Sequence, residues 1–350
     1  MFSRGNDFKN VQKRWDDFWK GENKRPLYSI AVPKSGRNAA PLPLYLMGFG
    51  GDYQAVADML ARWVDSREFL GEAVPVFSIT FGPDDFAALC GADLEMGKSG
   101  GTSWSVHPLK TLDGAKIAFE KNGKWWGKVT EFHRVLKKTL GDSVFIAAPT
   151  LSAGLDGIVG LYGAMNLLTD LMDNPELVHN AVSRINTAYT ETVKACGELF
   201  EYGKYGSANR FGMYTSGIAG VPQCDVSCMI SPGMFDEFAI PGLLHEIGAL
   251  DAATYHLDGP DALKHLERLA KIPGLRVIQW MPGAGEAESV DWTPLYKKIL
   301  ALGKGLILNG SAADVANMRR EFGSKDIAFN VWGIQSRAEA EDFLDDMEKI

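Results

Sequence analysis

The sequence predicts a single domain of the (β/α)8 TIM-barrel class. Short apolar runs alternate with amphipathic helical patterns along most of the chain, which indicates a parallel sheet covered by helices. Eight such runs follow residue 75, and eight parallel strands are the number that closes a barrel. The 350 residues, 46% of them hydrophobic, suffice for one large core spanning residues 1–350. An open doubly wound sheet is the alternative that the same alternation permits.

The N-terminal part is expected to form an extension of the barrel over residues 1–70. Residues 8–21 carry apolar side chains on one helical face, and the following Arg-Pro pair ends that helix. Residues 27–32 are typical of a strand. Residues 34–52 are rich in glycine and proline and predict a long loop, a kind of segment that usually carries function in enzymes.

The eight strand-like runs share β-branched or aromatic apolar residues, and the run at 225–230 is the weakest. They are 76–80, 143–149, 210–216, 225–230, 252–257, 276–281, 305–310 and 326–332. Clear helical patterns lie between them, at 174–203, 231–249, 260–271, 291–302, 311–321 and 335–348. Residues 101–122 predict a β-hairpin insertion that closes near Asp113-Gly114.

Composition excludes several classes of function. The net charge is −8 and the lysines and arginines are scattered, which disfavours a nucleic-acid partner because phosphate binding needs clustered cations. No apolar stretch approaches the roughly 20 residues that span a bilayer, and the N-terminus lacks a signal-peptide core. Four cysteines do not make a disulfide framework in a chain of this length. We therefore expect a cytoplasmic protein without a membrane partner, and a homodimer remains open.

His256 and Asp258 are the most informative pair of residues. Catalytic groups of (β/α) barrels lie at the C-terminal strand ends, and these two are the only strong acid–base or ligand groups that follow the runs. The alternation of a strand places them on the same side. They can then share a metal ion, or Asp258 can orient the imidazole. The alternative is that Asp258 caps the helix expected to begin near Pro260.

Aromatic, hydroxyl and amide residues dominate the other strand ends, and none of those ends carries an arginine. An aromatic pocket would suit a flat or methyl-bearing ligand, although core packing is the ordinary role of tryptophan. Tyr214 and Asn309 could supply hydrogen bonds. The residues that we expect to bind substrate are Tyr214, Asp225, Trp280, Asn309 and Trp332.

Three segments carry a family resemblance: RWDDFWKGENKRPLYSIAVPK at 14–34, ISPGMFDEFAIPGL at 230–243, and YHLDGPDALKHLERLAKIPGLRVIQWMPGAG at 255–285. With them the chain resembles, over nearly its whole length, the corrinoid-dependent methyltransferase branch of the uroporphyrinogen decarboxylase-like superfamily. The resemblance implies a (β/α)8 barrel that moves a methyl group between a small substrate and the cobalt of a cobalamin. That cobalamin is carried by a separate corrinoid protein, and this chain indeed lacks an Asp-x-His-x-x-Gly cobalamin motif.

The resemblance also bears on a metal. Many members of the branch hold zinc on a His-x-Cys pair and a distant cysteine. Here His256 matches the histidine, Asp258 stands where the first cysteine would be, and residues 330–333 supply no cysteine. A zinc site of the usual composition is therefore not expected, while a metal held by His256 and Asp258 remains chemically feasible.

Three hypotheses follow. In the first, a methyltransferase acts on a small methylated or methyl-accepting compound, and His256, helped by Asp258, polarises or protonates the reacting group. In the second, a cofactor-free lyase or decarboxylase acts on a small acid, with Asp225 or Asp258 handling the proton. Uroporphyrinogen itself is not expected, because its carboxylates need arginines near the N-terminus and the N-terminal loop supplies only Arg37. In the third, the barrel is a non-catalytic binding protein, and an enclosed pocket at His256 would argue against that.

Overall fold

A seven-stranded sheet forms the centre of the molecule in a computed structural model that describes residues 6–283 and 290–350. All of its neighbouring strands are parallel except the outermost pair, β2 and β1. Residues 27–33, expected within an extension, are therefore a strand of the main sheet. In spatial order the strands are β2 (Arg67–Gly71), β1 (Leu27–Pro33), β13 (Ile327–Trp332), β12 (Gly305–Ser311), β11 (Leu275–Met281), β10 (Ala252–Asp258) and β9 (Ala219–Gly220).

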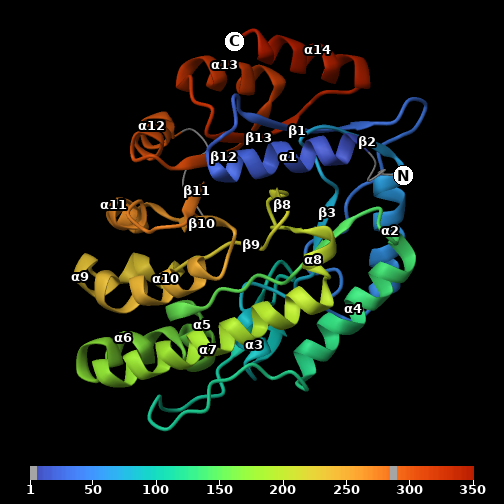
Figure 1. Cartoon of the computed structure of the whole chain (residues 1–350). Helices are drawn as coiled ribbons and strands as arrows, with labels where there is room; N and C mark the ends of the chain where they lie inside the picture. The colour runs from blue at the N-terminus through green and yellow to red at the C-terminus, as the bar shows by residue number, and fades with distance from the viewer. Residues whose placement is uncertain (1–5, 284–289) are drawn as a thin grey trace.

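Helices follow the strands and form the outside of the molecule, which confirms the predicted alternation (Figure 1). None of those in the described part of the chain combines the length and apolarity needed to cross a bilayer. The α-helices are α1 (Asn6–Lys20), α2 (Tyr53–Asp65), α3 (Asp85–Leu89), α4 (Lys124–Leu140), α5 (Gly154–Tyr162), α6 (Ala164–Asp173), α7 (Pro175–Leu199), α8 (Tyr202–Tyr205), α9 (Pro232–Met234), α10 (Ile240–Gly248), α11 (Leu266–Leu269), α12 (Thr293–Ala301), α13 (Ala312–Phe322) and α14 (Arg337–Glu348). Shorter turns are the 3-10 helices η1 (Asp225–Met229) and η3 (Pro260–His265) and the π-helical turn η2 (Phe235–Ala239).

Short strands continue the arc of strands beyond β9. β7 lies beside β9, β6 beside β7, and β6 pairs in parallel with β3. The arc stops between β3 and β1, because antiparallel β2 occupies the free edge of β1 from Ser29 to Pro33. The described strands thus form a mixed α/β fold with a large parallel sheet, and not a ring closed by hydrogen bonds. The short strands are β3 (Val76–Ser78), β6 (Phe145–Ala147), β7 (Ser207–Ala208) and β8 (Tyr214–Thr215).

The prediction of a strand at 225–230 is wrong. These residues form the 3-10 helix η1, and β9 takes the place in the sheet. The Asp156 carboxylate accepts the backbone N–H groups of Asp225 and Val226, at 2.7 and 3.1 Å. A side chain that accepts two successive backbone N–H groups favours a helical turn. Those N–H groups are then not available to pair with a neighbouring strand.

The run at 210–216 spans a turn. β7 ends at Ala208, and β8 returns antiparallel to it from Tyr214. The Asn209 side-chain oxygen accepts the backbone N–H groups of Phe211 (3.0 Å) and Met213 (3.3 Å), which closes the turn. The apolar residues of this run therefore lie on both sides of a reversal, and Arg210, not Tyr214, follows the C-terminal end of the inner strand.

The predicted hairpin exists, but earlier in the sequence. Strands β4 (Asp93–Met96) and β5 (Ser103–Val106) pair antiparallel around a glycine-rich turn, closed by a 2.7 Å hydrogen bond from Gly97 N to Thr102 O. Gly100 there has a φ of 71°, which glycine adopts without strain. Asp113-Gly114 lies in an isolated turn without a ladder, so only the first part of 101–122 belongs to the hairpin.

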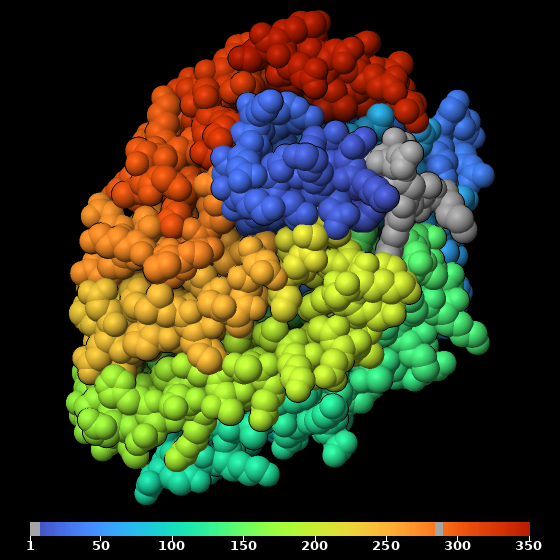
Figure 2. All heavy atoms as spheres, in the orientation of Figure 1, coloured from blue at the N-terminus to red at the C-terminus, as the bar shows by residue number. Residues whose placement is uncertain are grey.

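Helix α1 closes the N-terminal side of the sheet. Its buried Trp15 and Phe18 pack with Leu27, Val277 and Ala328, which lie near the beginnings of their strands. Figure 2 shows this blue segment lying between the orange-to-red C-terminal part and the yellow segment. Because this end is filled with side chains, a cavity can open only toward the opposite ends of the strands.

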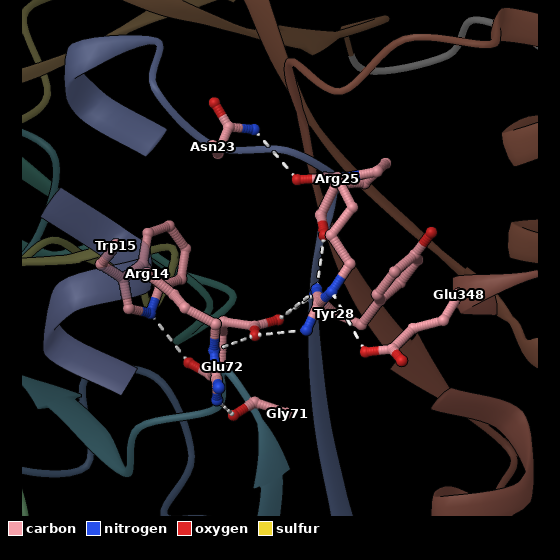
Figure 3. Close-up of polar contacts among 9 residues, drawn as sticks. Arg14, Trp15, Asn23, Arg25, Tyr28, Gly71, Glu72 and Glu348 are labelled. Atoms are coloured by element: carbon pink, nitrogen blue, oxygen red, sulfur yellow. Dashed lines mark hydrogen bonds and ion pairs between the residues drawn. The ribbon is translucent and has the colours of Figure 1, made fainter. Parts of the chain in front are cut away.

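A buried carboxylate fixes α1 in place (Figure 3). Glu72 is fully buried and accepts the backbone N–H of Tyr28 at 2.7 Å, while the guanidinium groups of Arg14 and Arg25 contact it at 2.6 and 3.0 Å. The Trp15 indole donates to the Glu72 carbonyl oxygen at 2.8 Å. This network joins α1, β1 and the chain that leaves β2.

Candidate functional site

A cavity of about 590 Å³ opens at the C-terminal ends of the strands, on the side opposite α1. The loop 42–48 forms one wall, which agrees with the functional loop that the sequence predicts. Polar groups gather at the other end of the cavity. They belong to Thr150, Arg210, Gln223, Asp225, His256 and Asp258.

Asp225, His256 and Asp258 converge in this cavity. One ligand atom from each lies within 4.8 Å of the others. His256 and Asp258 alternate along β10 and so face the same side, with 4.0 Å between His256 Nε2 and Asp258 Oδ2. A 3.0 Å backbone hydrogen bond from His256 N to Pro222 O holds the segment before η1 beside β10, and this contact places Asp225 in the cavity. The structure therefore brings together the His256–Asp258 pair and Asp225.

A neighbouring amide sets the tautomer of His256. Gln279 Nε2 donates to the carbonyl oxygen of Trp280 at 2.8 Å, which leaves Gln279 Oε1 to accept from His256 Nδ1. His256 therefore carries its proton on Nδ1, and the lone pair of Nε2 faces the cavity. That lone pair can accept a proton or bind a metal ion.

Asp225 lies among other carboxylates. Burial in the protein raises its pKa to about 8, and the negative charges of Asp156 and Asp258 act in the same direction. Its Oδ2 accepts a hydrogen bond from Gln223 Nε2 at 2.9 Å, and its side chain remains accessible through the cavity. The raised pKa favours the protonated, neutral form of Asp225, which can donate a proton into the cavity.

Arg210 is a site residue that the sequence analysis missed. Its two terminal nitrogens donate to Thr150 Oγ1 and Gln223 Oε1, both at 3.0 Å. Burial, reinforced by the positive charge of Arg210, lowers the pKa of His256, so the imidazole is neutral at pH 7. The statement that no strand end carries an arginine is therefore wrong. The sequence did contain a signal for Arg210: a basic residue at the start of the apolar run 210–216, directly after the turn-forming Asn209.

Two predicted substrate-binding residues lie away from the cavity. Tyr214 is fully buried toward the α1 side, where its hydroxyl donates to the Tyr205 carbonyl oxygen at 2.9 Å. Trp280 is buried against Trp292, with 4.9 Å between ring centroids. Because side chains alternate along β11, it is Gln279 and not Trp280 that faces His256. A glutamine inside the apolar run 276–281 was the signal for this phase.

The remaining two predicted residues lie near the strand ends but outside this cavity. Asn309 accepts a 3.0 Å hydrogen bond from the Asn330 side chain. Trp332 is 60% exposed and lines a second cavity of about 540 Å³, which adjoins the first. Of the five residues expected to bind substrate, only Asp225 lies with His256 and Asp258.

The donor set of the site fits a divalent metal ion. Asp258 Oδ1 is buried and makes no hydrogen bond to any residue that the structure describes, His256 Nε2 presents a lone pair, and Asp225 adds a second carboxylate. Imidazole and carboxylate ligands suit Zn²⁺, Fe²⁺ or Mn²⁺. Without a metal, the same groups can exchange protons with a bound ligand.

No protein-family model and no curated protein sequence matches the chain. Sixteen chains of solved structure are similar to it. One of them is a methyltransferase from Methanosarcina mazei, which aligns over 97% of this chain and 98% of its own with a TM-score of 0.61 and 13% sequence identity. At that identity the likeness establishes a shared fold over the whole length.

Proposed function

We propose that this chain is a corrinoid-dependent methyltransferase that moves a methyl group between a small substrate and a cobalamin carried by a separate protein. The observation that carries the proposal is the convergence of His256, Asp225 and Asp258 in a cavity at the strand ends. The fold shared with a methyltransferase supports it, as do the sequence segments that resemble the corrinoid-dependent branch.

The architecture that belongs to this proposal is the uroporphyrinogen decarboxylase-like (β/α)8 barrel. The strands follow one another in the order β1, β13, β12, β11, β10, β9, β7, β6 and β3, and the ladders from β1 to β9 and between β6 and β3 are parallel. This order would be that of a barrel in which one seam, between β3 and β1, lacks a ladder. The filled α1 side and the open strand ends agree with the usual polarity of such barrels.

The residues of the site can relieve charge on a reacting heteroatom. When a methyl group leaves oxygen, sulfur or nitrogen, the departing atom gains electron density and needs a proton or a Lewis acid. The raised pKa of Asp225 favours its proton-donating form, and Gln223 donates a hydrogen bond to its carboxyl group. His256, with Nε2 unprotonated, can accept a proton from an attacking group in the reverse direction.

A zinc ion would be held by His256 Nε2, Asp258 and Asp225, and it would supply Lewis-acid polarisation of the substrate heteroatom. The unpartnered Asp258 Oδ1 supports this proposal, because a buried carboxylate oxygen without a donor is costly unless a cation satisfies it. Gln279 would then act as the outer partner that keeps the imidazole oriented.

The cavity rim offers a surface for the corrinoid protein. Leu42, Leu44 and Tyr45 are 47, 78 and 58% exposed around the entrance, and such a patch is rare on a surface without a partner. The cobalamin on that protein would supply the cobalt that accepts or releases the methyl group. The loop 42–48 would exclude water once the partner covers it.

The proposal is tested with purified protein, free cob(I)alamin and a panel of low-mass methyl ethers, thioethers and quaternary amines. We expect the corrin absorbance to change with one class of methyl donor. His256→Ala should lower the rate by at least about 100-fold and change the melting temperature by only a few degrees. The matched control is His179→Ala, since His179 is half-exposed beside Glu237 and outside the cavity. Wild-type rates in His256→Ala would contradict the assignment.

A decarboxylase or lyase is the second candidate, and Arg210 favours it. A buried guanidinium beside a protonated Asp225 could bind the carboxylate of a small acid and protonate the carbanion left after CO2 loss. The same assay separates the two candidates. CO2 release from a small acid without any change in corrin absorbance would identify the lyase.

A further inference from the structure

The second cavity lies where the arc of strands is interrupted. Its walls come from β1 and β2 on one side and from the segment leading into β3 on the other. It shares Arg210, Phe211, Leu42 and Val76 with the cavity of His256, so the two hollows meet along these side chains. A molecule bound at His256 that is too long for the first cavity would extend into the second.

Arg67 in the wall of this cavity forms no ion pair with an acidic side chain in the described part of the chain. It alternates with Phe69 on β2, and both face the hollow. One terminal nitrogen donates to the Ala40 carbonyl oxygen at 3.1 Å, while its Nε is buried without a hydrogen bond. Among the residues that the structure describes, no carboxylate forms an ion pair with Arg67, whereas Arg14 and Arg25 share Glu72.

Arg210 adds a second positive charge where the cavities meet. Its hydrogen bonds go to the neutral side chains of Thr150 and Gln223, so its own charge is not cancelled by a bonded carboxylate. The remaining wall is largely aromatic, from Trp63, Phe69, Phe211 and Trp332. An apolar hollow attracts an anion to the half-buried guanidinium of Arg67, because its buried and unsatisfied Nε carries a desolvation cost that the anion would relieve.

We propose that the second cavity is a subsite for the carboxylate end of an elongated, apolar substrate. The reacting group would lie at His256, and the carboxylate would pair with Arg67 beyond Phe211. A carboxylate fits because its two oxygens match the planar guanidinium fork of Arg67. The part concerning the reacting group rests on the proposed methyl transfer, whereas the binding of a carboxylate does not.

Calorimetric titration with 4-phenylbutanoate and its neutral amide, 4-phenylbutanamide, tests the subsite without any turnover. We expect the wild-type protein to bind the carboxylate roughly 10- to 100-fold more tightly than the amide. Arg67→Met should remove that preference and leave amide affinity unchanged. The matched control is Arg62→Met, because Arg62 lies exposed on α2 outside both cavities.

A second pair of variants guards against a folding defect in Arg67→Met. Ala31 lies on β1 opposite Phe69 and lines the cavity, so Ala31→Glu places a carboxylate beside Arg67. Ala31→Glu should abolish the preference for the carboxylate, while the isosteric Ala31→Gln should retain it.

The outcomes separate the two proposals. Equal binding of acid and amide by the wild-type protein, or equal loss of both in Arg67→Met, would overturn the subsite even if corrin methylation is observed. Binding of inorganic phosphate without binding of 4-phenylbutanoate would overturn it as well. A retained carboxylate preference in a protein that never methylates cobalt would instead refute the methyltransferase and leave the subsite standing.

Discussion

At the scale of single residues, Gln279 controls what His256 can do. The glutamine amide is fixed by the Trp280 carbonyl oxygen, so only its oxygen faces the imidazole. Removing that acceptor lets the proton move to Nε2, where it would occupy the lone pair that serves the cavity. Gln279 is therefore a positioning residue, which acts through His256.

Gln279→Leu tests this role. We expect turnover and metal affinity to fall by about 10- to 100-fold, as is common when the partner of a ligand histidine is lost. The nitrogen NMR shifts of His256 in chelator-treated protein should change from the Nδ1–H to the Nε2–H pattern. Gln54→Leu on the exposed side of α2 is the control. An unchanged tautomer together with lower activity would mean that Gln279 acts only through packing.

The buried carboxyl group of Asp85 is expected to make the stability of the protein depend on pH. Its side chain is buried, accepts the backbone N–H of Phe81 at 2.9 Å, and bonds with the Thr80 hydroxyl. Burial raises its pKa to about 7. The folded chain therefore holds this proton more tightly than the unfolded chain, so the associated stability is complete below about pH 4 and is lost as the pH rises through 7.

Urea denaturation between pH 5 and pH 8 measures this effect. The unfolding free energy of the wild-type protein should fall by about 2–3 kcal/mol relative to Asp85→Asn over this range. Asparagine preserves an oxygen for Phe81 N and a donor for Thr80, and it does not titrate. Parallel curves for the two proteins would show that Asp85 is ionised in the folded state.

His256, Asp258 and Asp225 were all named from the sequence, but only the proximity of the two residues on β10 was predictable, and Arg210 and Gln279 were missed. His256 and Asp258 stand two apart on one strong strand, so alternation alone puts them together. Arg210 and Asp225 depend instead on the Asn209 turn and on the Asp156 contact, both made across the chain. The position of Gln279 depends on which side chains of a buried strand face the site, and because both faces of β11 are otherwise apolar, only the glutamine itself indicated this.

At the scale of elements, the helices were the most predictable part. The long helix expected at 174–203 is α7, and the patterns near the C-terminus correspond to α12, α13 and α14. Their apolar stripes repeat over several turns, so single exceptions do not hide them. The inner strands of the first half have only two or three residues, which is too short for a period to be visible.

The loop 42–48 illustrates an element whose position depends on a close contact. A Cβ placed on Gly48 would lie 2.4 Å from Cε1 of Phe132, a ring that stacks on Tyr53 and lines the cavity of His256. The loop can therefore lie against α4 only where it has no side chain. This contact sets the wall of the site.

Gly48→Ala should displace this wall. We expect a raised KM with a smaller effect on kcat, and a lower melting temperature, because either the loop or the Phe132 ring must move. Gly50→Ala is the matched control, since a Cβ there meets nothing within 4 Å. Equal kinetics for both variants and the wild-type protein would show that the loop does not contribute to substrate binding.

At the scale of the whole molecule, the strands are built in two ways. The last four, β10 to β13, have six or seven residues each, and the β10–β11 and β12–β13 ladders each join six residue pairs, whereas β3, β6, β7, β8 and β9 have only two or three residues. The alternation of strands and helices in the sequence predicted the long parallel strands β10 to β13. It could not predict the seam between β3 and β1. The free edge of β1 can pair with either β2 or β3, and the alternation does not say which of them takes it; in the structure it is β2.

This asymmetry predicts how the molecule opens. Long, buried ladders exchange their amide hydrogens only through large unfolding events, whereas short strands exchange through local ones. We expect the amides of β10, β12 and β13 to be the slowest in hydrogen–deuterium exchange, and those of β3, β7 and β8 to exchange markedly faster. The two cavities meet at the seam beside β3, so a long ligand bound there should slow exchange at β3 and leave β12 unchanged. Uniform protection across all strands would mean instead that the seam is as rigid as the sheet, and that the site opens only by movement of the loop 42–48.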